Sequence, residues 1–94
     1  MATERSLSIT HGETFSLVVR SRETEYFRGN IAALSSTNKK GAFDILPEHA
    51  HFISLIKKGI TIHKTDGSTQ EITFSNAVLK VKDNTAEVYI GIGI

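Results

Sequence analysis

Apolar and polar residues alternate along most of this chain, in short segments separated by polar or glycine-bearing breaks. In the segment Phe15–Arg20, for example, Phe15, Leu17 and Val19 share one side and the residues between them share the other. Period-two alternation of this kind is typical of a β-strand with one buried face. The same pattern predicts strands at residues 26–28, 31–35, 42–46, 52–56, 60–64, 69–74, 78–82 and 86–92. No window of a dozen residues has the three-and-four apolar spacing of a packed helix, so nothing long is predicted to be helical.

The breaks between these segments predict tight turns. Asp66 and Gly67 lie between two alternating segments and favour a hairpin, because both residue types tolerate the positive φ that such turns need. Asp83 and Asn84 predict a second, slightly looser hairpin, and Pro47 predicts a corner between two strands. Polar or glycine-bearing breaks at residues 29–30 and 57–59 are also expected to separate strands.

About nine to ten short strands without crossover helices predict an all-β fold with antiparallel pairing, and we favour a single antiparallel β-sandwich over a small barrel. A chain of 94 residues is expected to form one domain. We assign the sandwich to residues 14–94. Residues 1–13, which have few apolar positions, are expected to form an N-terminal extension that is either mobile or an added edge strand.

Charge and composition exclude several classes of function. Eleven Lys and Arg residues against 10 Asp and Glu residues give a net charge of +1, which provides no whole-protein field for nucleic acid or anionic lipid. The absence of cysteine excludes disulfides and thiolate metal sites. No apolar stretch approaches the roughly 20 residues of a membrane-spanning helix.

The sequence contains little evidence of a metal site or a catalytic site. His49 and His51 could chelate a metal from one face of a strand, but a third ligand would be needed, and the candidate His63 belongs to another predicted strand. Serine and histidine residues occur without the framed nucleophile of a hydrolase. We therefore predict no catalytic residue, no metal and no cofactor.

Two lysine pairs suggest one alternative. Lys39 and Lys40, and Lys57 and Lys58, fall in predicted loops, where a small oligonucleotide-binding barrel would use them beside stacking aromatic residues. Phe15 and Phe74, however, lie on strand faces rich in apolar residues, which is typical of a core. Single-strand binding therefore remains the less favoured hypothesis.

Residues 41–50, with the sequence GAFDILPEHA, resemble the N-terminal β-sandwich domain of the epsilon subunit of rotary ATP synthases, in which a strand runs into Ile-Leu-Pro-Gly-His-Ala-Pro. The stretches around Phe27–Gly29, at residues 57–62 and at residues 75–84 agree with that family in order and spacing. The resemblance covers about residues 14–91. Glu48 stands where the family has glycine, so the turn after Pro47 is expected to differ in detail.

The resemblance implies a non-catalytic rotor subunit at the cytoplasmic face of a membrane, to which it is attached through its partners. In that family the sandwich binds the central gamma shaft and the c-ring and so couples ion translocation to ATP synthesis. Carried over by position, the shaft would be bound by His49, Ala50, His51, Phe52 and Ser54, with Phe52 as an exposed anchor. The ring would be bound by Asn38, Lys39, Lys40, Gly41 and Ala42.

Two further expectations accompany the resemblance. The helical hairpin that usually follows the sandwich is expected to be missing, because the chain ends at Ile94 as the last strand runs out. The alternative within the same fold is a free-standing interaction domain that has changed its partner.

Overall fold

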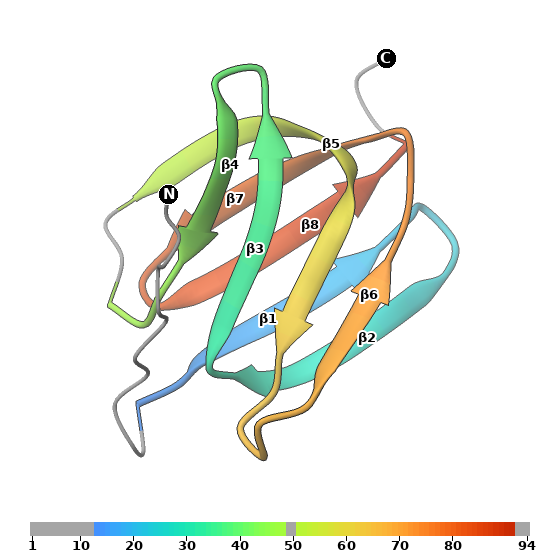
Figure 1. The fold of residues 1–94 in the computed structure, drawn as a ribbon. Helices are drawn as coiled ribbons and strands as arrows, with labels where there is room; N and C mark the ends of the chain where they lie inside the picture. The colour runs from blue at the N-terminus through green and yellow to red at the C-terminus, as the bar shows by residue number, and fades with distance from the viewer. Residues whose placement is uncertain (1–12, 49–50, 92–94) are drawn as a thin grey trace.

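The computed structural model describes residues 13–48 and 51–91, which form eight β-strands joined by short connections (Figure 1). Strands account for 69% of these residues, and no helix occurs among them. In chain order the strands are β1 (Phe15–Arg20), β2 (Glu25–Ile31), β3 (Ala33–Asn38), β4 (Gly41–Ile45), β5 (Phe52–His63), β6 (Thr69–Ile72), β7 (Asn76–Lys82) and β8 (Thr85–Ile90).

Hydrogen bonds join all eight strands into one sheet in the order β2-β1-β8-β7-β5-β3-β4, with β6 also paired to β5. Strand β5 pairs with β7 along residues 52–57 and with β6 along residues 60–63. Between these two halves the strand bends, so that β4, β3, the second half of β5, and β6 form one layer over β7, β8, β1 and β2 (Figure 1). The sandwich therefore consists of one folded sheet.

The bend in β5 depends on an unusual backbone. Lys58 has φ 75° and Gly59 has φ 129°, both in the region that L side chains rarely adopt. A Cβ atom at Gly59 would lie 2.5 Å from the Ile72 carbonyl oxygen and 2.9 Å from Thr73 Cα. Glycine is therefore required here for two reasons, the φ value and the close approach of the connection between β6 and β7.

The core lies between the two layers and contains the inward-facing residues of the alternating segments. Fully buried large side chains come from every described strand except β6: Leu17, Val19, Ile31, Leu34, Ile45, Ile56, Ile62, Leu79 and Val88. Phe15 is buried and Phe74 packs against this cluster, so both belong to the core and neither forms a stacking platform for bases.

The all-β prediction is confirmed, with eight strands in place of nine to ten. The predicted break at residues 57–59 is wrong, because β5 continues through it as a bent strand of 12 residues. The predicted break at residues 29–30 is also wrong, because β2 pairs with β1 through both residues. Glycine and asparagine weaken a strand, but continuous pairing with β1 from Phe27 to Ile31 outweighs that local preference.

The pairing is also not wholly antiparallel. β1 and β8 pair in parallel, with Leu17 beside Ala86 and Val19 beside Val88. Tight turns set the direction only of strands that follow one another along the chain. β1 and β8 are the first and last of the described strands, so no turn connects them and their relative direction does not follow from the turns.

Both predicted hairpins are present. The turn after β5 closes through a hydrogen bond from the Lys64 amide to the Ser68 carbonyl, at 2.9 Å. The expectation that the turn between β7 and β8 is the looser of the two is wrong. It is the tighter one, since Lys82 pairs directly with Thr85 and both central residues, Asp83 and Asn84, have positive φ. Two consecutive residues with positive φ are typical of the two-residue turn that matches the twist of its strands.

The corner predicted at Pro47 separates β4 from β5. Glu48 has φ 67°, a value that glycine adopts more readily than glutamate, and its amide donates a hydrogen bond to Asn84 Oδ1 at 2.7 Å. The Asn84 side chain also donates to the Thr14 carbonyl at 2.9 Å. The backbone at Glu48 therefore has a conformation suited to the glycine of the family motif, although the side chain differs.

No helix in the described part of the chain is long and apolar enough to cross a membrane. Of the predicted N-terminal extension, only Glu13 lies within the described residues.

Candidate functional site

The segment assigned to the ring forms the turn between β3 and β4. Asn38 pairs with Gly41 across this turn, and Lys39 and Lys40 form its tip. The Lys40 amide donates to Asn38 Oδ1 at 2.8 Å, which fixes the turn from within. Ala42 follows Gly41 in the paired part of β4 and lies opposite Thr37. The two lysines therefore stand on an ordered hairpin tip.

The segment assigned to the shaft leads into the first half of β5. His49 and Ala50 lie outside the described residues. His51 is exposed, and its Nε2 lies 3.7 Å from Asp83 Oδ1. Phe52 is half-buried and its ring centroid lies 5.6 Å from that of Phe43, so the expectation of an exposed anchor at Phe52 is wrong.

The exposed large apolar side chains of β5 are those of Ile53 and Leu55, close to Phe52 in the chain. Ile53 is 71% exposed and Leu55 is 59% exposed, among the largest exposures of large apolar residues in the described chain. Alternation along a strand turns neighbours to opposite sides, so the inward position of Phe52 places Ile53 outward. The signal was present in the sequence, because residues 52, 53, 55 and 56 are all apolar and one face of the strand cannot hold all four.

The structure brings the two predicted partner-binding segments together. Asn38 Nδ2 donates a hydrogen bond to Ser54 Oγ at 3.2 Å, which joins the β3–β4 turn to β5. A groove of about 500 Å³ lies between them. We call it the lysine groove and define it by its lining residues: Asn38, Lys39, Lys40, Phe52, Ile53, Ser54, Leu55 and Lys57.

A strip of uncharged side chains continues from this groove over the outer face of the layer that contains β7 and β8. Leu55 pairs with Val78 and Val78 pairs with Tyr89, so the three side chains lie in one row across β5, β7 and β8. Partial burial raises the pKa of Tyr89, with a hydrogen bond to Glu87 as a further cause. The phenol therefore stays neutral near pH 7 and extends the uncharged strip.

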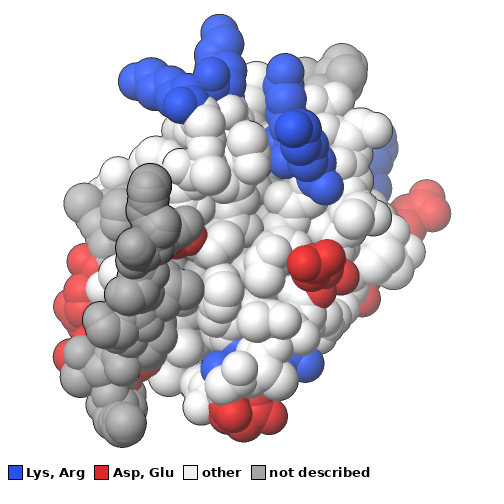
Figure 2. Space-filling view, viewed as in Figure 1, with Lys and Arg blue, Asp and Glu red and all other residues white. Residues whose placement is uncertain are grey.

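Lysines surround the groove. Figure 2 shows Lys and Arg groups gathered at the end of the molecule where the β3–β4 turn lies in Figure 1. No described acidic residue lies within ion-pair distance of Lys39, Lys40 or Lys57. Their charges are therefore available to a partner.

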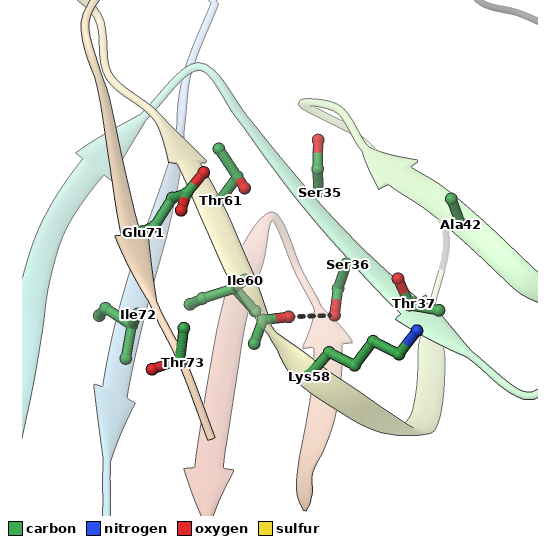
Figure 3. Close-up of a pocket in the computed structure, with 11 residues that line it drawn as sticks. Ser35, Ser36, Thr37, Ala42, Lys58, Ile60, Thr61, Glu71, Ile72 and Thr73 are labelled. Atoms are coloured by element: carbon green, nitrogen blue, oxygen red, sulfur yellow. Dashed lines mark hydrogen bonds between the residues drawn. The ribbon is translucent and has the colours of Figure 1, made fainter. Parts of the chain in front are cut away.

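A second hollow, of about 300 Å³, lies among β3, β5 and β6, and five serine and threonine side chains are among the residues that line it (Figure 3). Ser36 Oγ, at its base, donates to the Gly59 carbonyl at 2.8 Å. Ser35 Oγ donates to Asp44 Oδ1 at 2.6 Å and lies 2.8 Å from His63 Nε2. Because the Ser35 proton is directed to the carboxylate, His63 is not placed as its base, and the cluster lacks the arrangement of a catalytic triad.

The structure does not bring His51 and His63 together. His51 precedes β5 and His63 is its last residue, so the 12-residue strand separates them. No group of three potential metal ligands occurs within residues 13–48 and 51–91. His63 is therefore not placed to share a metal with His51, and His49 lies outside the described residues.

At one end of the two-layer β scaffold, exposed apolar side chains therefore lie beside lysines that have no acidic partner among the described residues. The family model of the ATP synthase Delta/Epsilon chain beta-sandwich domain matches residues 14–91, and the chain belongs to that family. The resemblance seen in the sequence is thereby confirmed.

A curated relative agrees with this assignment. The chain is 29% identical over 79 residues to the ATP synthase epsilon chain of a Nitratiruptor species, a match that covers 83% of this chain and 61% of that protein. The chain thus spans about three fifths of the length of the relative it matches.

Two solved structures share the fold. A chain in the mitochondrial ATP synthase of Euglena gracilis (OSCP/F1/c-ring, rotational state 1) superposes with a TM-score of 0.76 at 12% identity, covering 96% of this chain and 57% of that one. A chain in the central stalk and c-ring of Tetrahymena thermophila mitochondrial ATP synthase superposes with a TM-score of 0.69 at 15% identity, covering 86% and 66%.

Proposed function

We propose that this chain is the sandwich module of a central-stalk rotor subunit in a rotary ATP synthase, where it binds the gamma shaft and the c-ring without catalysing a reaction itself. In this role it couples ion translocation to ATP synthesis at the cytoplasmic face of the membrane, held there by its partners. The family membership over residues 14–91 is the observation that carries the proposal.

The surface chemistry supports a binding role. Exposed Ile53 and Leu55 lie next to unpaired lysines on the same end of the sandwich, in the region that the family resemblance assigns to partners. Burial of such apolar side chains against a partner is favourable by about 1.5 to 3 kcal/mol each when complete. A stiff sheet scaffold also suits a contact that must transmit torque without bending.

The residues proposed for each partner are those of the resemblance, with two additions. His49, Ala50, His51, Phe52 and Ser54 are proposed for the shaft, and Ile53 and Leu55 join them as its exposed apolar anchors. Asn38, Lys39, Lys40, Gly41 and Ala42 are proposed for the ring. No cofactor or metal is proposed for either contact.

Purification from native membranes tests this function. A tagged chain expressed from its own gene should bring down gamma and the c-ring together with the catalytic subunits. Changing Ile53 and Leu55 to serine should reduce the recovered gamma several-fold, whereas changing Tyr26, which is 49% exposed on β2, to serine should leave recovery unchanged. Recovery of a different partner, with no ATP synthase subunit, would instead favour the free-standing interaction domain.

A further inference from the structure

The lysine groove has a one-sided charge. Three lysines line it, at positions 39, 40 and 57, and no acidic residue does among those described. The whole chain has a net charge of only +1, so this concentration of positive charge is local. An acidic partner would therefore be attracted to this end of the molecule.

The groove is also partly apolar. Ile53 and Leu55 line it and are largely exposed, whereas most large apolar side chains of the described residues are buried or half-buried. A partner that supplied only negative charge would leave these two side chains in water. The complementary segment must therefore carry at least one apolar side chain beside its acidic residues.

The walls of the groove are held in place. The Asn38 side chain accepts a hydrogen bond from the Lys40 amide at 2.8 Å and donates one to Ser54 Oγ at 3.2 Å, so one residue links the turn to β5. Thr37 also pairs with Lys57, in the middle of β5. A preformed groove lowers the entropy that a ligand must overcome on binding.

We propose that the lysine groove binds an acidic peptide segment of a partner protein, with an apolar side chain of that segment seated against Ile53 and Leu55. The inference rests on the proposed function, since it specifies the chemistry of the partner surface that meets this end of the sandwich. A concave site of about 500 Å³ accommodates a few side chains, whereas a membrane surface is flat and would leave the groove unfilled. The shape thus favours a peptide over anionic lipid.

Titration of the full chain with a short labelled peptide tests the inference. The probe is the blocked peptide Asp-Leu-Glu-Leu-Asp, and its counterpart Lys-Leu-Lys-Leu-Lys controls for apolar binding alone. Amide NMR signals of residues 38–40 and 53–57 should shift with the acidic peptide and not with the basic one. Raising the salt concentration should weaken binding, because exposed charges are screened.

Charge reversal locates the site. The double change Lys39→Glu and Lys40→Glu should weaken binding of the acidic peptide by about tenfold or more, since close opposite charges become like charges. The matched control changes Arg22 and Lys64, both outside the groove, to glutamate and should alter the affinity by less than about twofold, in line with its distance from the bound peptide. Leu55→Ser should weaken binding without altering charge, and thermal unfolding should show each variant to be folded.

Three results would overturn the inference: equal binding of both peptides, shifts confined to residues outside the groove, or loss of binding equally in the control variant. Binding of phosphatidylglycerol vesicles that depends on Lys39 and Lys40, without binding of the acidic peptide, would also overturn it in favour of a lipid site.

If the tagged chain purifies with gamma and the c-ring but the acidic peptide does not bind, only the groove inference fails. If the peptide binds the groove but no synthase subunit is recovered, only the proposed function fails.

Discussion

The two halves of β5 follow the same alternating pattern but present opposite chemistry to solvent. In the second half, Ile60 and Ile62 enter the core and the outward residues, Thr61 and His63, are polar. In the first half, Ile56 enters the core, yet the outward residues Ile53 and Leu55 are also apolar. The isoleucines of the second half are therefore buried within the chain, whereas Ile53 and Leu55 of the first half are not covered by any of the described residues.

The two halves of this strand therefore contribute to different properties, one to the stability of the fold and the other to binding. The apolar side chains of the second half stabilise the fold, because burial removes them from water. Those of the first half contribute little to folding while they are exposed, and they can contribute to association. The junction at Gly59 is what permits the two halves to belong to different layers.

The largest effect is expected at that junction. Gly59→Ala should destabilise the protein by about 3 kcal/mol or more, because the added Cβ combines an unfavourable φ with a backbone contact that has no flexible side chain to move. Urea unfolding measures the change in free energy. The control is Gly41→Ala, which has a similar φ of 123° but open space around it, and which should cost about 1 kcal/mol. Equal effects at both positions would show that the close approach at the bend is unimportant.

Truncation of one apolar residue from each half tests the comparison itself. Ile62→Ala should lower the free energy of unfolding by about 3 kcal/mol, since it leaves a cavity in the core. Leu55→Ala should lower it by less than about 0.5 kcal/mol, because the side chain is already mostly in water. If both variants remain folded, Leu55→Ala should reduce the recovery of gamma with the tagged chain more than Ile62→Ala does. A large loss of stability from Leu55→Ala would contradict the division.

The corner that leads into the first half should allow a gain in stability. Glu48→Gly is expected to raise the free energy of unfolding by about 0.5 to 1 kcal/mol, because glycine adopts the observed φ of 67° without steric cost, although it also increases the freedom of the unfolded chain. Urea unfolding monitored by circular dichroism measures it. The control, Glu23→Gly in the exposed turn after β1, lacks a positive φ and should not be stabilised.

The smallest effect concerns the turn that leaves the second half. Hydrogen bonds from the Ser68 side chain and amide to Asp66 hold the pKa of the Asp66 carboxyl below its ordinary value. A lowered pKa in the folded state means that the ionised carboxylate stabilises the fold above its unfolded pKa, and that this contribution is lost as pH falls through the folded pKa. Asp66→Asn should therefore reduce stability slightly at pH 7 and should lose less stability than the wild type between pH 5 and about pH 2. Urea unfolding at each pH measures the stability of the two proteins. An equal loss of stability in both between pH 5 and about pH 2 would contradict the stabilising role of the Asp66 carboxylate.

Local patterns predicted much of the fold. Alternation at Phe15, Leu17 and Val19 identified β1 and its buried side, and the Asp66-Gly67 and Asp83-Asn84 pairs marked both hairpins. These features depend on residues close together in the chain. Local reasoning placed breaks at Gly29 and Gly59, which both lie inside strands. At Gly29, pairing with β1 outweighs the residue's own preference. At Gly59 the strand uses the positive φ of glycine to bend instead of ending.

The candidate site was predicted less completely. The family motif identified the neighbourhood of the β3–β4 turn and of β5, but Phe52 was assigned the exposed role that Ile53 and Leu55 have. Which of two adjacent apolar residues faces outward depends on how the strand is placed against its layer. That the turn and β5 share one groove depends on the Asn38–Ser54 contact between segments 16 residues apart.

By itself the sequence determined that this chain forms short strands with tight turns around an apolar core, and its motif determined the family to which it belongs. These properties follow from side-chain periodicity and from residues adjacent in the chain. Only the tertiary structure decided that β1 pairs in parallel with β8, that one bent strand joins the two layers, and that the lysines gather around exposed apolar side chains. Such features arise from contacts between distant segments, whose free energy depends on packing in three dimensions and is not encoded in any local pattern.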